Sequence, residues 1–295
     1  MHRCVVTRDP SSEAFERLFG PEFGHGKAFD LARLGAALSK LGDPQSKLAP
    51  IIHVAGTNGK GSAIAFMRAI AEAAGLRAHA FTKPHLWALN ERFTIAGEPV
   101  SDEALIAVAA RVAQADAALT HFDAQIAAAF VLFSETPADL VLLETGMGGR
   151  DDSTNVIAAP ALTIITPIGL DHQDALGGSL EAIAAHKAGI LKLGTPAIIA
   201  RQEAEAMAVI EARAAEIGAP LLRAGVEWDA YASHSRLVVQ TETRALDLPL
   251  PALAGGHQID NAGLACAALM AWREISDDAF AQGVANAHWR AAYSR

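Results

Sequence analysis

The sequence predicts an α/β fold, in which a doubly wound and mostly parallel sheet is flanked by helices. Short apolar runs rich in β-branched residues alternate with longer alanine-rich segments through most of the 295 residues. This alternation is typical of parallel strands that are joined by crossover helices. With 51% hydrophobic residues, the chain can bury a substantial core. Its length allows one large domain or two small ones, and the pattern favours one.

The apolar runs are short and rich in residues that suit a pleated surface. We expect strands at 51–54, 78–81, 140–143, 162–166 and 196–199. The alanine-rich segments have the composition of helices, which we expect at 63–74, 101–116, 120–133, 179–191 and 204–217. The pattern changes between 221 and 248, where the segment 236–239 and its short neighbours predict a small antiparallel β patch. A helix at 257–272 completes the series.

A glycine-rich turn follows the first expected strand, in the segment Ile51 to Ser62, which reads IIHVAGTNGKGS. Its glycines are Gly56, Gly59 and Gly61. Glycine lets the backbone turn tightly and direct N–H groups at an anion, and the helix N-terminus adds partial positive charge. Lys60 supplies counter-charge for phosphate, and the Ser62 hydroxyl can contact phosphate or Mg²⁺. The sequence therefore predicts a phosphate-binding loop.

The spacing of this loop differs from the common GxxxxGK[ST] pattern. Val54 stands where that pattern has its first glycine, and Gly61 separates Lys60 from Ser62. We interpret the segment as a variant phosphate loop. The alternative is a turn that only joins a strand to a helix, but it leaves unexplained why the lysine and the hydroxyl both fall at the helix start.

Two later strands are expected to end in groups that suit a metal–nucleotide site. Glu144 follows the run 140–143 and precedes a glycine-rich turn, and Asp171 and His172 follow the run 162–166. In doubly wound sheets, ligands bind at the carboxyl ends of the strands, so these groups should share a crevice with the phosphate loop. A carboxylate there would hold Mg²⁺. The alternatives are a solvated acid for Glu144 and an ordinary surface or core histidine for His172.

Charge and cysteine usage limit the classes of partner. The net charge of −9, the pI near 5.6 and the lack of any basic run argue against a nucleic-acid partner. Cys4 and Cys266 have no metal-ligand spacing and fit a reducing compartment. The sequence has neither an apolar signal region at its start nor about 18 consecutive apolar residues anywhere. We expect a cytoplasmic monomer that binds small molecules and neither nucleic acid nor membrane.

Five segments, in chain order, carry a family resemblance. They are HVAGTNGKGS, TKPHLWALNERFTIAGEPVS, ETGMGGRDDSTNVI, ITPIGLDHQDALGGSLEAIAAHKAGILK and LAGGHQIDNAGLACAAL. Together they resemble folylpolyglutamate synthase/dihydrofolate synthase of the Mur ligase superfamily, over nearly the whole chain from about 29 to 289. Other Mur ligases share the loop and the glutamate. The NERF and GMGGRDDSTN segments point to the folate branch, and the family's fold would make this chain a P-loop central ATPase domain.

The resemblance implies an ATP-dependent ligase that joins L-glutamate to dihydropteroate or folate. The substrate carboxylate would attack the γ-phosphate of ATP to give an acyl phosphate, and the amine of glutamate would then displace phosphate. ATP and Mg²⁺ are the implied cofactors, with up to two metal ions. Two alternatives stay open: a nucleotide-binding domain without ligase activity, and another Mur-type amide ligase.

The resemblance also assigns roles to residues. The implied ATP-binding residues are Gly56, Thr57, Asn58, Gly59, Lys60, Gly61, Ser62, His257, Gln258 and Asn261. The implied metal ligands are Glu144, His172 and Ser62, and the implied catalytic residues are Lys60, His172 and Lys187. Lys187 stands where the family carries a lysine that can be carbamylated, and such an anion can serve a second Mg²⁺. The implied pterin or folate side consists of Asp152, Lys83, Pro84 and His85.

Lys83 departs from the family pattern. The family commonly has serine at this position, where its hydroxyl helps to bind Mg²⁺. A protonated ammonium has donors but no lone pair for a metal ion. Either Lys83 contacts phosphate or substrate directly, or this loop has lost its metal contact.

The second departure lies at the end of the sequence. The family carries a further C-terminal domain of roughly 130 residues, the size of one domain, after a linker that should resemble WPGRLQ. This chain instead ends WRAAYSR. One DNA sequence that encodes WPGRLQ is TGG CCG GGC CGC CTA CAG. Deleting one C from its proline codon gives a frame that encodes WRAAY and, with a following C, serine. We expect an ATP-binding domain at 1–288 and an aberrant, frameshifted tail at 289–295 with impaired ligase activity; the alternative is a domain expressed alone on purpose.

Overall fold

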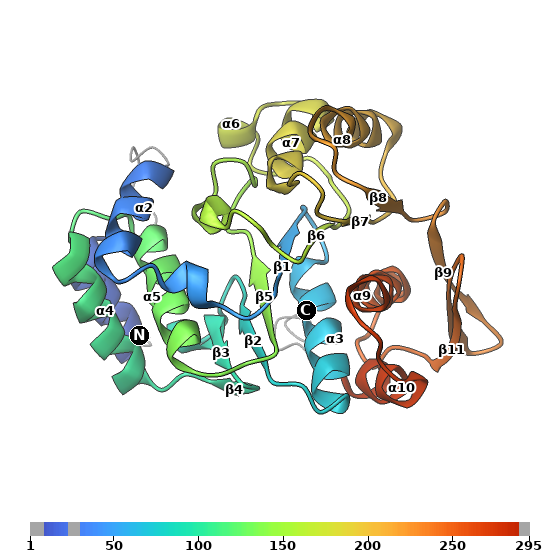
Figure 1. Cartoon of the computed structure of the whole chain (residues 1–295), viewed down its shortest axis with the longest axis horizontal. Helices are drawn as coiled ribbons and strands as arrows, with labels where there is room; N and C mark the ends of the chain where they lie inside the picture. Colours follow the sequence, from blue (N-terminus) through green and yellow to red (C-terminus); the bar gives the residue numbers. More distant parts are fainter. Residues whose placement is uncertain (1–8, 23–29, 289–295) are drawn as a thin grey trace, which may run out of the picture.

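An eight-stranded sheet forms the centre of the computed structural model, which describes residues 9–22 and 30–288 (Figure 1). Its strands, in the order in which they lie side by side, are β4 (Glu98–Pro99), β3 (Phe93–Ile95), β2 (Ala78–Phe81), β5 (Leu140–Glu144), β1 (Ile51–Ala55), β6 (Leu162–Ile165), β7 (Ala197–Ile199) and β8 (Leu221–Arg223). From β2 to β8 the neighbours run parallel, whereas β3 and β4 form an antiparallel edge. The predicted α/β class is confirmed. The expected tail and Cys4 lie outside the described residues.

Helices cover both faces of the sheet. On one face the helices are α3 (Lys60–Ala73), α9 (Gln258–Trp272) and α10 (Asp277–Asn286). On the opposite face the helices are α1 (Pro10–Phe19), α2 (Leu31–Lys40), α4 (Asp102–Asp116) and α5 (His121–Glu135), followed by α7 (Leu180–Lys187) and α8 (Ala204–Ile217). The short elements are α6 (Gln173–Leu176) and the 3₁₀ turns η1 (Pro44–Lys47), η2 (Leu89–Arg92), η3 (Ser153–Val156) and η4 (Ala188–Ile190). Ile52 and Val54 of β1 face α3, and Ile51 faces the opposite side, as strand alternation requires.

The predicted antiparallel patch is a separate sheet beside α9 (Figure 1). Its strands are β9 (Trp228–Ser233), β10 (Arg236–Thr241) and β11 (Ala245–Pro249), with β10 in the middle. Gly263 lets α9 approach this sheet, because a Cβ there would overlap the side chain of Ala230. One boundary was wrong: residues 221–223 form β8, which pairs in parallel with β7 in the main sheet.

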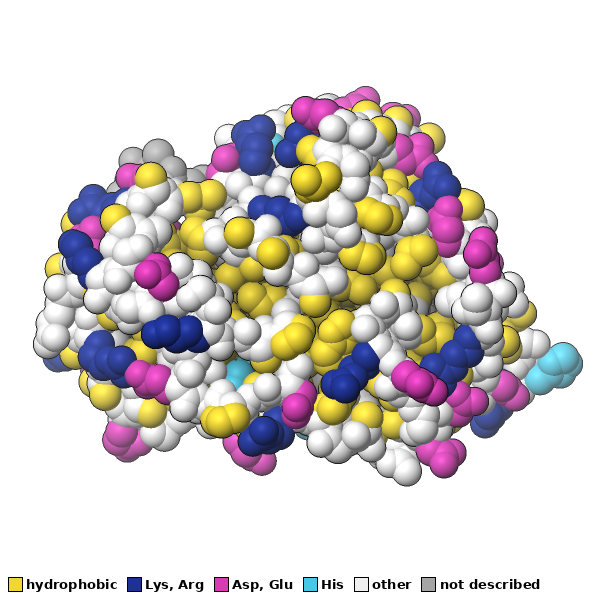
Figure 2. All heavy atoms as spheres, in the orientation of Figure 1, with side chains coloured by type: hydrophobic (Ala, Val, Ile, Leu, Met, Phe, Trp, Pro, Cys, Tyr) yellow, Lys and Arg dark blue, Asp and Glu magenta, His cyan; other side chains and the backbone are white. Residues whose placement is uncertain are grey.

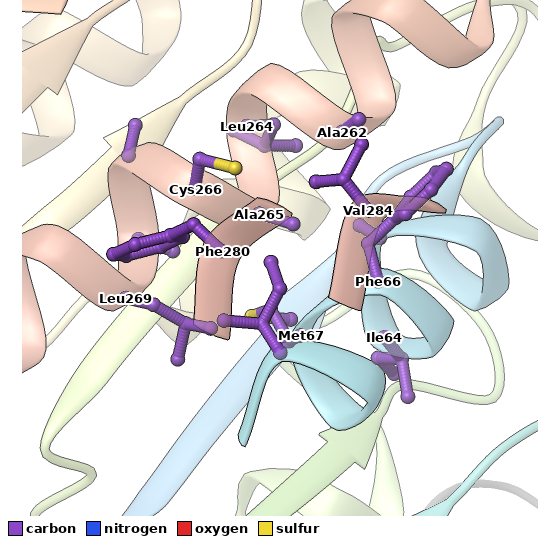
Figure 3. Close-up of a cluster of buried hydrophobic side chains, with 14 of the residues drawn as sticks. Ile64, Phe66, Met67, Ala262, Leu264, Ala265, Cys266, Leu269, Phe280 and Val284 are labelled. Carbon is purple, nitrogen blue, oxygen red and sulfur yellow. The ribbon is translucent and has the colours of Figure 1, made fainter. Parts of the chain in front are cut away.

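Packing of α3 against α9 and α10 forms the apolar core on one side (Figure 3). Phe66 and Met67 of α3 meet side chains of both C-terminal helices, among them the buried Cys266 and Phe280. Gly283 allows α10 to lie directly on α3, because a Cβ at this position would overlap the backbone of Ile70. The C-terminal helices therefore bury the outer face of the helix that begins at the phosphate loop.

Several elements differ from expectation for local reasons. Helix α3 begins at Lys60, three residues before its expected start. Gly59 has a φ of +85° and turns the chain directly into this helix. The segment 179–191 divides into α7 and η4, where Gly189 lies against Arg150. The elements not predicted from the sequence are α1, α2, α10 and the β3–β4 hairpin. Capping residues mark all three of these helices, since Asp9, Asp30 and Ser276 each accept a hydrogen bond from a first-turn N–H.

Surface character is mixed on the face shown in Figure 2. Lys and Arg side chains alternate with Asp and Glu around the rim, and hydrophobic side chains gather near the middle. Within the described residues, no single helix has the length and apolar character needed to cross a bilayer; α4 and α5 meet that test only together, across a bend of 114°.

Gly283→Ala should lower the free energy of unfolding by about 1 to 3 kcal/mol, because the added methyl group forces α10 away from α3. Urea unfolding measures the change. Gly35→Ala in α2 is the matched control: a Cβ there meets nothing within 4 Å, so the substitution should stabilise the chain by about 0.5 to 1 kcal/mol. Equal effects of both changes would contradict this account of the α3–α10 contact.

Candidate active site

The carboxyl ends of three adjacent strands bring the candidate site together. Val54 of β1 pairs with Glu144 of β5, and Ala55 pairs with Ile165 of β6. The chain leaves all three strands at one level, and Thr145 N–H donates to Val54 O at 3.0 Å across that edge. The phosphate loop, the Glu144 turn and the loop after β6 therefore start side by side.

The phosphate loop ends in a helix terminus that no side chain caps. Gly59 precedes α3 in a left-handed conformation, and the first turn of α3 receives no side-chain cap. The N–H groups of Thr57 and Asn58 both donate to Pro167 O, at 3.0 and 3.2 Å, which ties the loop to the segment after β6. Unpaired first-turn N–H groups and the helix dipole make this terminus suitable for an anion.

Two lysines converge on one carbonyl group of this loop. Lys60 Nζ donates to Gly56 O at 3.0 Å and to Thr57 O at 3.1 Å, and Lys187 Nζ donates to Gly56 O at 2.7 Å. Lys187 is only 3% exposed. Burial, together with the charge of Lys60, lowers the pKa of Lys187 to about 8. A negative charge at this point would relieve the repulsion between the ammonium groups of Lys60 and Lys187.

Glu144 is a buried carboxylate between two lysines. Its Oε2 accepts a hydrogen bond from Lys83 N–H at 3.0 Å, and its Oε1 lies 3.9 Å from Lys60 Nζ. Burial raises the pKa of Glu144 to about 7, although Lys60 and Lys83 oppose the shift. A divalent cation would stabilise the ionised form, and a carboxylate oxygen is a ligand that Mg²⁺ prefers. The chemistry of this residue therefore fits the implied metal ion.

The N-terminus of α9 lies against the phosphate loop. Asn261 packs on Gly59, where a Cβ would overlap its amide oxygen, and Asn261 Nδ2 donates to Gln258 Oε1 at 3.0 Å. Gln258 Nε2 in turn lies 3.4 Å from Ser62 Oγ and 3.1 Å from His257 Nε2. The structure thus brings the predicted nucleotide residues of α9 to the loop from the far end of the sequence.

Lys83 lies beside Phe122 and Gly146 in the neighbouring part of the candidate site. Lys83 Nζ lies 3.5 Å from Gly146 O and 5.3 Å from the centre of the Phe122 ring. Gly146 is required here, because a Cβ would overlap that ring. Burial lowers the pKa of Lys83, and nearby Arg92 lowers it further. Among the described residues, Lys83 Nζ forms no ion pair within 4 Å, so its charge is available to an anionic ligand.

Asp152 lies under the glycine turn that follows β5. Its carboxylate accepts hydrogen bonds from Met147 N–H at 2.7 Å, Thr154 N–H at 3.0 Å and the Thr154 hydroxyl at 2.5 Å. The residue is buried, and burial raises its pKa. Asp152 thus holds the turn 146–150 in place beside Lys83.

Arg92 and Glu91, which were not predicted as site residues, position the segment 83–88. Arg92 is 2% exposed, and its guanidinium pairs with Glu22 at 2.7 Å, donates to Gln125 Oε1 at 2.7 Å and donates from Nε to His85 Nδ1 at 2.9 Å. The carboxylate of Glu91 accepts the N–H groups of residues 86–88 at 3.0 to 3.3 Å. The NERF segment was the available signal, because it contains both residues.

Among the predicted site residues, His172 and Pro84 are exposed. The His172 side chain is 52% exposed, has a φ of +48° and lies 3.6 Å from Asp171. Pro84 is exposed and follows a cis peptide bond. In the part of the chain that the structure describes, no three His, Cys, Asp or Glu residues gather as a metal site. The role of His172 as a metal ligand stays a prediction.

Comparison with known proteins identifies the family. Residues 54–269 match the model of the Mur ligase middle domain. The chain belongs to the Mur ligase family. It is 38% identical over 279 residues to the dihydrofolate synthase/folylpolyglutamate synthase of Bacillus subtilis, a match that covers 88% of this chain and 64% of that protein. The protein of the same name from Escherichia coli is 37% identical over 270 residues, with coverage of 89% and 62%.

Solved structures of Mur ligase relatives agree. E. coli FolC in complex with DHPP and ADP superposes with a TM-score of 0.86 and 33% identity, covering 96% of this chain and 67% of that chain. A bifunctional folylpolyglutamate synthase/dihydrofolate synthase with Mn, AMPPNP and L-glutamate bound gives a TM-score of 0.85 and 34% identity, with coverage of 97% and 68%. The predicted folate-branch membership is confirmed. The chain spans slightly less than two thirds of the length of its curated relatives from these two bacteria.

Glu144→Gln should raise the melting temperature of the metal-free chain at pH 8 and leave it nearly unchanged at pH 5. A carboxyl group whose folded-state pKa is raised to about 7 contributes stability below its unfolded pKa, which is lost as the pH rises through 7. The difference between the two pH values is on the order of 3 kcal/mol at most. Melting curves at both pH values measure it.

The exposed Glu205→Gln is the matched control, since a substitution of an exposed side chain should change the melting temperature little. Mg²⁺ should stabilise the wild-type chain at pH 8 but not Glu144→Gln. A Glu144→Gln chain that melts below the wild type at pH 8 without metal would contradict this account of the buried carboxylate.

Proposed function

We propose that this chain is the ATP-binding part of a ligase that joins L-glutamate to dihydropteroate or folate. The observation that carries the proposal is the gathering of phosphate-, metal- and carboxylate-binding groups at one sheet edge. An uncapped helix terminus with Lys60 and Lys187 lies at one end, Glu144 lies in the middle, and Lys83 and Asp152 lie at the other end. The names of the relatives supply the substrates.

Phosphoryl transfer requires positioning and charge neutralisation more than covalent participation by the protein. The first-turn N–H groups of α3 and Lys60 would hold the phosphates of ATP. Lys83 would neutralise the incoming substrate carboxylate, which attacks the γ-phosphorus as ADP leaves. The resulting acyl phosphate offers phosphate as a leaving group, and the amine of L-glutamate displaces it to form the amide. Glu144 and Ser62, with His172, would hold Mg²⁺, which supplies charge neutralisation at the phosphates.

A chemical modification of Lys187 belongs to the same proposal. The neutral amine of Lys187 would attack CO₂, forming an N–C bond and releasing a proton, and the product is a carbamate anion. The pKa of the Lys187 amine is about 8. Roughly one tenth of this amine is therefore neutral at pH 7, which is sufficient for the reaction. A carbamate here would place negative charge beside Lys60 and offer oxygen ligands for a second Mg²⁺.

A nucleotide-binding domain without ligase activity is the second candidate. The groups suited to phosphate support this candidate, namely the uncapped start of α3 with Lys60 and Lys187, because ligase chemistry needs in addition a glutamate site and a site closed to water. We further propose that residues 1–288 act as one unit and that the protein is a cytoplasmic monomer with small-molecule partners only. The acidic net charge of −9 supports the lack of a nucleic-acid partner.

Release of ADP from ATP and Mg²⁺, with and without dihydropteroate and L-glutamate, tests the two candidates. Ligase chemistry requires release that depends on dihydropteroate or folate. Release that is independent of substrate would support the nucleotide-binding domain, and no response to any pterin would contradict the folate assignment. Lys60→Ala should lower release by about 10²-fold to 10³-fold in either case, because one preorganised positive group is lost.

Labelled bicarbonate tests the carbamate. With ¹³C-bicarbonate, the wild-type chain should give a carbamate carbon resonance that strengthens between pH 7 and pH 8.5, as the neutral fraction of an amine with a pKa of about 8 rises. Lys187→Gln should remove the resonance. Lys192→Gln is the matched control, because burial lowers the pKa of Lys192 as well. A resonance that survives in Lys187→Gln would contradict the proposed modification site.

A further inference from the structure

His53 is a buried histidine on β1 that no role described above uses. Its side chain is fully buried on the face of the sheet opposite α3, since its neighbours Ile52 and Val54 face that helix. His53 Nε2 lies 2.8 Å from the hydroxyl oxygen of Thr154 in η3. The same hydroxyl contacts Asp152 Oδ1 at 2.5 Å. A chain of hydrogen bonds therefore links the central strand to the buried carboxylate of the substrate side.

The chemistry of these groups determines the direction of each hydrogen bond. An ionised carboxylate can only accept, so the Thr154 hydroxyl donates its proton to Asp152. The lone pairs of the hydroxyl oxygen then face His53, and His53 Nε2 must carry the proton. His53 Nδ1 is left without a proton, and within the described residues this buried nitrogen has no hydrogen-bond partner. A bare acceptor is tolerated in a protein interior better than an unpaired N–H group.

In this series of hydrogen bonds, the His53 imidazole always acts as a donor. Burial, with a smaller contribution from the charge of Lys192, lowers the pKa of His53 to about 3. The ring therefore stays neutral wherever the protein is folded near neutral pH, and the direction of the hydrogen bonds does not change with pH.

The carboxylate of Asp152 ends this series of hydrogen bonds, and protein donors fill most of its acceptor positions. Met147 N–H, Thr154 N–H and the Thr154 hydroxyl donate to it, which fills three of about four acceptor sites. About one acceptor position remains, and its direction is determined by the other three. Met147 also belongs to the turn that holds Gly146 against Phe122, so the same hydrogen bonds position this turn beside Lys83.

We infer that His53 is a positioning residue for the pterin side of the site, acting through Thr154 to orient Asp152 and the turn 146–150. β1 continues from His53 into the phosphate loop, which starts at Gly56 only three residues later. One strand thereby sets the positions of the nucleotide side and the pterin side relative to each other. This inference rests on the proposed function, in which Asp152 serves a pterin ligand.

Removing the middle hydroxyl tests the inference. Thr154→Val keeps the shape of the side chain but cannot link His53 to Asp152. It should weaken binding of dihydropteroate by about tenfold to a hundredfold, as expected for a lost hydrogen bond to a charged group, and leave binding of ADP with Mg²⁺ within about twofold. Thr154→Ser restores the hydroxyl and should restore binding. Calorimetric titration of the purified chain with each ligand provides both affinities.

Thr163→Val is the matched control. Thr163 is a buried threonine that pairs with His53 on the neighbouring strand β6, and its hydroxyl has no hydrogen-bond partner among the described residues. Its loss should leave the affinities for dihydropteroate and ADP unchanged. If Thr154→Val weakens both ligands equally, the network only supports the fold and the inference is wrong. The inference also fails if Thr154→Val binds dihydropteroate as the wild type does.

Nitrogen NMR of the wild-type chain tests the hydrogen-bond direction without any ligand. The ring of His53 should show a protonated Nε2 and a bare Nδ1, unchanged between pH 5.5 and pH 8.5. A proton on Nδ1, or titration in this range, would overturn the inference. If the wild-type chain binds ADP but no dihydropteroate, the proposed function fails by itself, and the NMR result still decides whether His53 donates to Thr154.

Discussion

Hydrogen bonding between β1 and its parallel neighbours β5 and β6 sets the level at which three loops leave the sheet. Val54 pairs with Glu144, and Ala55 pairs with Ile165, so the phosphate loop, the Glu144 turn and the segment after β6 begin together. A slip of one residue would turn every side chain of a strand to the other face. It would take Glu144 away from Lys60 and His53 away from Thr154. The geometry of the site therefore depends on strand register before it depends on any single side chain.

Charged groups gather at this edge of the sheet. Lys60 and Lys187 share the carbonyl group of Gly56, and the buried Glu144 lies 3.9 Å from Lys60. Burial shifts the pKa values of Lys187 and Glu144 toward neutrality from opposite directions. Groups that are neither fully charged nor fully neutral at pH 7 are typical of functional sites. Phosphate, a divalent cation or a carbamate would each satisfy part of this arrangement.

The two faces of β1 serve different purposes. Ile52 and Val54 pack on α3 and join the core that α9 and α10 complete, which anchors the helix behind the phosphate loop. His53 points to the other face and contacts η3, the turn that carries Thr154. Apolar packing thus secures the nucleotide side, and a short hydrogen-bonded chain secures the substrate side. Both sides therefore take their positions from one strand.

Local pattern and strand periodicity by themselves determined the α/β class, most strand positions, the phosphate loop and the placing of Glu144 at a strand end. These features follow from residues close in sequence and from the rule that parallel strands share an edge. Only the tertiary structure decided four further features. Gln258 and Asn261 reach the phosphate loop from α9, and Lys187 shares Gly56 O with Lys60. Arg92 holds His85 by a hydrogen bond, and the His172 side chain stays exposed. Such contacts join residues far apart in the chain, and their distances depend on packing that spacing in the sequence does not encode.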